Sequence, residues 1–136
     1  MVEMKIEYLG DLRCKLTHGP SGTQIITDAP VDNQGKGESF SPTDLVASSL
    51  GACMITIMGI VAKRHNIDLS GLKATVQKDM VSEPERRIGK LTVVITFGKS
   101  YSDKDKQLLE RSALACPVHK SISHDVEIPV KFVYPK

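Results

Sequence analysis

The stretch SPTDLVASSLGAC, residues 41–53, opens the longest apolar segment of the chain and decides its fold. Ser41 is a good helix N-cap, Pro42 suits the first helical position, and Asp44 favours the positive end of a helix. Basic residues precede Asn66, which can close the helix at its other end. The pattern predicts one helix of about 22 to 24 residues, roughly 35 Å long.

Apolar side chains surround this predicted helix. One stripe repeats at spacings of four and three, and it consists of Val46, Leu50, Cys53, Ile57 and Ile60. Further large apolar residues cover much of the remaining surface, namely Leu45, Met54, Met58 and Val61. A helix that is apolar nearly all round must be buried nearly all round. Because a single small domain can hardly surround such a helix, we expect a homodimer that supplies another wall.

The segments on either side of this helix predict strands and one further helix. Three short alternating segments precede it and predict an antiparallel meander, followed by a Gly- and Pro-rich loop at residues 29–41. Ser102 begins a capping signal for a second helix, from Asp103 to about Ala115. The predicted strands cover residues 2–8, 13–17, 23–28, 72–80, 91–97 and 126–132. The sequence thus predicts the α+β class and a single domain over residues 1–136.

Composition argues against several classes of partner. The formal net charge is only +2, aromatic residues make up 4% and Trp is absent, so a nucleic-acid surface is not expected. The longest uncharged run, Leu45 to Val61, is too short for a comfortable membrane span, and we expect no membrane partner. The first ten residues do not resemble a signal peptide, and three cysteines without such a signal predict a reducing cytoplasm.

The segment ACPVHK, residues 115–120, places a cysteine directly before a proline. If a new helical turn starts at Pro117, Cys116 is its N-cap, and the free N–H groups there lower the pKa of a thiol. His119 could polarise this thiol or pair with it, and a plain surface histidine is equally consistent with the pattern. No regular set of further ligands accompanies the Cys-x-x-His spacing, so no metal site is expected.

Two of the cysteines could act together. Cys53 lies on the apolar stripe of the long helix, where the simplest interpretation is a small buried hydrophobic residue. If Cys53 and Cys116 meet across a helix–helix contact, one thiol can react with a peroxide and the other can condense with the sulfenic acid. Cys14, in the second predicted strand, is expected to be passive. Arg13 and Glu38 could be ordinary solvated charges.

The stretch SPTDLVASSLGAC at the start of a long apolar helix, followed downstream by ACPVHKSI, resembles the OsmC/Ohr family of peroxide-reducing proteins. The resemblance implies an OsmC-like fold, with antiparallel sheets around a long central helix in an intertwined homodimer. It also implies thiol-dependent reduction of organic hydroperoxides, without a bound cofactor. Cys53 would attack the peroxide and Cys116 would resolve it to a disulfide. An external dithiol, such as a dihydrolipoyl group, would then reduce the disulfide.

The resemblance has one departure. Family members that reduce hydroperoxides carry a glutamate ten residues before the first cysteine, where it pairs with an arginine from the early strands. That position is Thr43 here. Arg13 matches the early arginine, and Glu38 could reach in from the loop as the carboxylate. The alternative function is a non-catalytic dimeric module that binds a hydrophobic small molecule, with inert cysteines.

Overall fold

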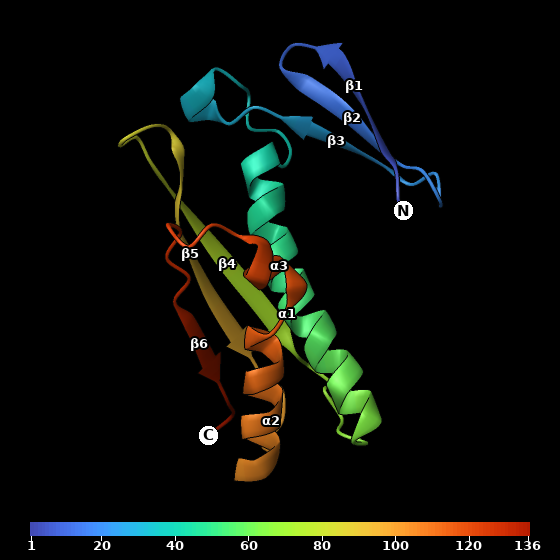
Figure 1. Cartoon of the computed structure of the whole chain (residues 1–136), viewed down its shortest axis with the longest axis vertical. Coiled ribbons are helices and arrows are strands. Elements are labelled where there is room, and N and C mark those ends of the chain that lie inside the picture. The colour runs from blue at the N-terminus through green and yellow to red at the C-terminus, as the bar shows by residue number, and fades with distance from the viewer. The chain divides into compact units, whose positions relative to one another are not determined.

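The computed structural model describes all residues 1–136 (Figure 1). The chain forms two compact units, Met1–Val46 and Ala47–Lys136, and each is described by itself. Both contain a three-stranded sheet, and the fold belongs to the α+β class that the sequence predicts.

The first unit is the predicted meander. Strands β1 (Met4–Gly10), β2 (Arg13–His18) and β3 (Gln24–Asp28) form an antiparallel sheet in that order. The register places Ile6 opposite Leu16 and Leu16 opposite Ile25, so apolar side chains share one face. A short 3-10 helix, η1 (Val31–Asn33), lies in the following loop.

Helix α1 (Pro42–Arg64) begins and ends as the sequence predicts. The backbone N–H of Ser41 donates to Asp44 Oδ2 at 2.9 Å, and the N–H of Asp44 donates to Ser41 Oγ at 3.1 Å. These reciprocal bonds are a capping box that satisfies two otherwise free donors. Asn66 follows the last turn with a left-handed φ of 53°. Asp44 therefore caps the helix directly, besides carrying charge at its positive end.

The second unit contains strands β4 (Lys73–Val81), β5 (Arg87–Thr96) and β6 (Val130–Val133). β4 and β5 pair antiparallel, as expected, but β6 pairs parallel to β5. The expectation of purely antiparallel sheets is therefore corrected for this strand. Helices α2 (Asp103–Leu114) and α3 (Pro117–Ser121) lie between β5 and β6 in the sequence. This long crossover returns the chain to the end where β5 began, which is what a parallel pair requires.

The buried stripe of α1 differs from the predicted one. The residues that this helix buries are Ala47, Leu50, Gly51, Met54, Met58 and Ala62. They belong to a core shared with β5 and α2, and both helices cover one face of the sheet in Figure 1. Gly51 allows close packing, because an added Cβ would lie 2.8 Å from Val76 Cγ2. Of the predicted stripe, Leu50 is buried, Cys53 is half-buried and Ile60 is 45% exposed.

One chain does not surround α1. Ile60 remains exposed, and only 33% of the most apolar 18-residue window of the helix is buried. By length and composition α1 could also cross a membrane, but core helices of soluble proteins meet the same criteria. The expectation that α1 is buried nearly all round is therefore not met within a single chain.

Candidate functional site

The second unit brings the thiols of Cys53 and Cys116 together, close enough for the Cys53 side chain to raise the pKa of the Cys116 thiol. Cys53 lies in α1, Cys116 directly precedes α3, and neither is in a disulfide. Cys53 is half-buried, whereas Cys116 has no exposed surface. A reagent from solvent can therefore reach Cys53 more readily, while Cys116 is placed to react with Cys53.

Cys116 is the N-cap of α3, as the sequence predicts. Pro117 occupies the first turn of this helix, and the backbone N–H of His119 donates to Cys116 Sγ at 3.2 Å. The Cys116 N–H donates in turn to the carbonyl oxygen of Ala113, near the end of α2, at 3.4 Å. The end of one helix and the start of the next thus fix the position of this sulfur.

The pKa of Cys116 changes in the opposite direction from the sequence-based prediction. Burial raises the pKa of this thiol, the His119 N–H lowers it by a smaller amount, and the neighbouring Cys53 thiol raises it further. The prediction of an activated Cys116 thiolate is therefore wrong, because loss of solvation outweighs the donors at the helix start. Burial therefore favours the protonated form of this thiol.

His119 contacts Cys116 through its backbone rather than through its imidazole. The sequence raised a pairing between the imidazole and the thiol, and the structure replaces it with a helix-capping N–H. No three His, Cys, Asp or Glu side chains come together as a group that could hold a metal ion.

Arg13 and Glu38 meet in the first unit. Arg13 Nη2 lies 3.0 Å from Glu38 Oε1 and 3.3 Å from Asp28 Oδ2. The backbone N–H of Glu38 also donates to Asp28 Oδ2, at 3.0 Å. Asp28 thus holds both partners of the ion pair. The Glu38 side chain is 57% exposed, so this pair orients the guanidinium more than it stabilises the fold.

Asp28 is the member of this cluster that the sequence analysis missed. Its side chain is completely buried, and its Oδ1 atom has no hydrogen-bond partner. The N–H of Glu38 lowers the pKa of this carboxyl most strongly, burial opposes that effect, and Arg13 lowers the pKa further. The signal was present in the sequence, because the predicted meander places Asp28 in the strand beside Arg13, and the two are register partners.

Two further candidate positions, Thr43 and Cys14, also lie in the first unit. Thr43, at the position of the family glutamate, has its Oγ1 atom 3.2 Å from Ser41 Oγ at the start of α1. Cys14 lines an apolar cavity of about 310 Å³, whose other lining residues are Ile6, Leu16, Thr27, Pro42 and Leu45. Cys14 is therefore not one of the paired thiols.

Asp28→Asn should lower the free energy of unfolding at pH 7, because a neutral amide holds Arg13 and the Glu38 N–H less strongly. The folded-state pKa of Asp28 is depressed, so its contribution is present above the unfolded value of about 4 and is lost as pH falls through the folded value. Urea unfolding at pH 7 and pH 3 measures this. The difference in free energy of unfolding between Asp28→Asn and the wild type should be smaller at pH 3 than at pH 7. Glu3→Gln, at an exposed position, is the control. A difference that is the same at both pH values would contradict the stabilising role of the ionised Asp28 carboxylate.

Comparisons with known proteins agree with this architecture. The family profile described as OsmC-like protein matches residues 35–131. A solved protein of Psychrobacter arcticus 273-4, named for osmotic stress induction and a detoxification response, is 48% identical, with a TM-score of 0.91 over 97% of this chain and 96% of that one. A comparison with curated proteins finds no match.

More distant structures share the fold. The organic hydroperoxide resistance protein OsmC of Legionella pneumophila has a TM-score of 0.76 at 18% identity, over 98% of this chain and 96% of that one. OhrB of Bacillus subtilis has a TM-score of 0.69 at 18% identity, over 97% of each chain. The profile match covers most of the sequence and the Psychrobacter protein nearly all of it, so the chain belongs to the OsmC-like family.

Proposed function

We propose that the protein reduces organic hydroperoxides to alcohols with Cys53 and Cys116. The observation that supports this most directly is the contact between a half-buried thiol and a fully buried one. Two structural neighbours are named for organic hydroperoxide resistance, which is consistent with this chemistry. The reaction uses no bound cofactor, and we place it in the cytoplasm.

In the first step the Cys53 thiolate attacks the terminal oxygen of the hydroperoxide. An S–O bond forms, the O–O bond breaks, and the alkoxide takes up a proton to leave as the alcohol. Cys53 is oxidised to a sulfenic acid. The mostly apolar surface of α1 favours an alkyl or lipid hydroperoxide over hydrogen peroxide.

In the second step the Cys116 sulfur attacks the sulfenic sulfur of Cys53. An S–S bond forms, the S–O bond breaks, and the hydroxyl group leaves as water with the proton of the Cys116 thiol. Burial of Cys116 keeps it from competing for the peroxide, which explains how two adjacent thiols take different roles. An external dithiol, such as a dihydrolipoyl group, then restores both thiols by exchange and becomes a disulfide itself.

We assign Arg13 and Glu38 to stabilisation of the Cys53 thiolate. The support is chemical: guanidinium N–H groups are strong donors to an anionic acceptor, and Glu38 with Asp28 fixes the direction of the guanidinium. Glu38 would supply from the loop the carboxylate that is absent at Thr43. His119 assists through its N–H on Cys116.

We further propose that the chain works as a homodimer. One face of β1, the face on which Ile6 also lines the apolar cavity, carries Met4, Ile6 and Tyr8, which are 55%, 64% and 65% exposed. Contiguous apolar surface of this kind marks an interaction site. Ile60, 45% exposed on α1, adds apolar surface in the second unit. A second copy of the chain would cover such surfaces and bury more of α1.

A non-catalytic binding module is the second candidate function. The observation that favours it is the apolar cavity of about 310 Å³ beside Cys14. Such a module would gain thermal stability from an apolar ligand and would leave its thiols unchanged by peroxide.

Treatment of the reduced protein with one equivalent of cumene hydroperoxide should remove two of its three thiols. Cys116→Ser should stop at a sulfenic acid, Cys53→Ser should not react, and Cys14→Ser should behave as the wild type. Intact mass and a free-thiol count measure all four proteins. Added dithiol should restore the thiols. If all three thiols of the wild type survive, the proposed peroxidase activity is wrong, and the non-catalytic binding module is the candidate function that stands.

Arg13→Ala should slow oxidation of Cys53 roughly tenfold or more, because it removes the guanidinium N–H donors that the proposal assigns to the attacking thiolate. Stopped-flow measurement of sulfenic acid formation across pH gives both the rate and the apparent pKa. Lys15→Ala is the matched control, since Lys15 lies in the same strand and pairs with Glu7. An unchanged pH profile in Arg13→Ala would remove Arg13 from the mechanism.

Sedimentation velocity should give a dimer for the wild type and a monomer for Ile6→Glu, because a carboxylate cannot be buried unpaired in an apolar interface. Lys5→Glu, on the opposite face of β1, is the control and should remain dimeric. Circular dichroism checks that each variant is folded. A wild-type monomer, or a dimeric Ile6→Glu variant, would contradict the proposed interface.

A further inference from the structure

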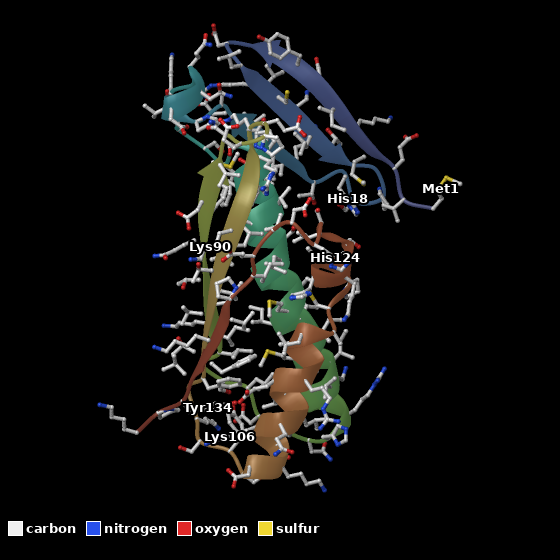
Figure 2. All side chains as sticks on the ribbon, turned by 60° about the vertical axis from the view of Figure 1, so that its left-hand side comes forward. Met1, His18, Lys90, Lys106, His124 and Tyr134 are labelled. Carbon is white, nitrogen blue, oxygen red and sulfur yellow. The ribbon has the colours of Figure 1, made fainter.

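A cavity in the second unit has basic and hydroxyl side chains along its polar part. Its volume is about 270 Å³, and His119, Lys120, Ser123 and His124 contribute the polar lining. Figure 2 labels His124 beside the ribbon of α3. None of these side chains has a part in the two thiol steps, and no carboxylate lines the cavity. The lining therefore offers donors and positive charge without an internal anion to neutralise them.

The backbone around this cavity is held in place by hydrogen bonds. The Lys120 N–H donates to the Cys116 carbonyl oxygen, and the Asp125 N–H donates to Ser123 Oγ at 3.2 Å. The Val126 N–H donates to the Ser123 carbonyl oxygen at 3.1 Å, which closes a tight turn. Ser123 Oγ accepts this backbone bond through a lone pair, so its O–H is still available as a donor.

The charge of the cavity lining also favours an anion. Lys120 is a cation with three donors, and a neutral imidazole presents one ring N–H. Arg87, whose Nη1 atom lies 3.4 Å from the carbonyl oxygen of Asp125, is a second cation outside the lining. The side chains of Asp125 and Glu127 carry the opposing charge nearby and do not line the cavity.

The rest of the lining is aliphatic and consists of Ile122, Val126 and Ile128. A cavity of about 270 Å³ is below the usual range for drug-sized ligands, so its ligand is small. A polar part rich in donors and an aliphatic part fit a molecule with one anionic end and a short hydrocarbon body. A carboxylate matches the Lys120 ammonium, the Ser123 hydroxyl and an imidazole N–H.

We propose that this cavity binds the carboxylate of a small aliphatic acid. His119 connects it to the thiols, because the His119 side chain lines the cavity while its N–H contacts Cys116 Sγ. Two kinds of reactant share this chemistry, a hydroperoxide that carries a carboxylate and a dithiol that carries one. Binding of either reactant in the cavity would raise its concentration beside the thiols. Only this link to the thiols rests on the proposed function.

The binding step is tested with octanoate as the probe, titrated calorimetrically into the reduced protein. Octanoate should bind at least tenfold more tightly than 1-octanol, which lacks the charge. Lys120→Glu should weaken octanoate binding about tenfold or more, and Lys120→Gln should weaken it less. Lys104→Glu, an exposed lysine on α2, is the control and should bind as the wild type. Equal binding by Lys120→Glu and wild type, or no binding by the folded wild type, would overturn the proposal.

The two kinds of reactant are separated by turnover. In Lys120→Glu, the KM for dihydrolipoate should rise while the KM for neutral dithiothreitol stays the same, if the site serves the reductant. A rise confined to a carboxylate-bearing hydroperoxide, with cumene hydroperoxide unchanged, assigns the site to the substrate. No rise in either would overturn its link to the thiols. Octanoate binding without any peroxidase turnover would reject the proposed function and leave the carboxylate site standing.

Discussion

The contact between the Cys53 and Cys116 thiols depends on the sharp break between α2 and α3. Pro117 starts a new helix, so the chain turns at Cys116 and buries its sulfur. Burial has two effects on that thiol: it excludes solvent reagents, and it keeps the proton on the sulfur. A thiolate at this position would not suit the resolving role that we propose, because it could react with the peroxide before Cys53 does. In the proposed mechanism, loss of solvation rather than helix polarity therefore separates the two roles.

Helix α1 supplies the other thiol, and its apolar surface is wider than one chain can use. The stripe through Leu50, Met54 and Met58 packs on the sheet of the second unit, while Ile60 stays exposed. An apolar surface on several sides of a helix predicts that the helix is buried, but it does not predict which segment or chain covers it. Cys53 lies between the buried stripe and the open side, which is why its thiol is only half-buried. The side of α1 that one chain leaves uncovered also makes the Cys53 thiol accessible to solvent.

Much of this fold could be predicted from the sequence because its signals are local. Capping residues identified the starts of α1 and α2, and the alternation of apolar and polar residues identified the strands of the meander. The parallel pairing of β6 could not be predicted this way, because strand direction depends on how the crossover packs. The pKa of Cys116 was missed for a similar reason: the N-cap geometry is local, whereas burial comes from distant segments. Asp28 was missed because its importance comes from pairing with Arg13 across two strands.

The charge balance of the Arg13 cluster bears on how fast such a site can work. One guanidinium faces two carboxylates, Asp28 and Glu38, so the cluster carries a net negative charge when all three groups are ionised. At a distance the field of Arg13 is cancelled, and only N–H groups that point directly at a thiolate could stabilise it. A single carboxylate partner would leave more of the positive charge available. In the proposed peroxidase, a neutral Thr43 and a doubly paired Arg13 therefore favour a modest rate, with orientation of the guanidinium mattering more than its charge.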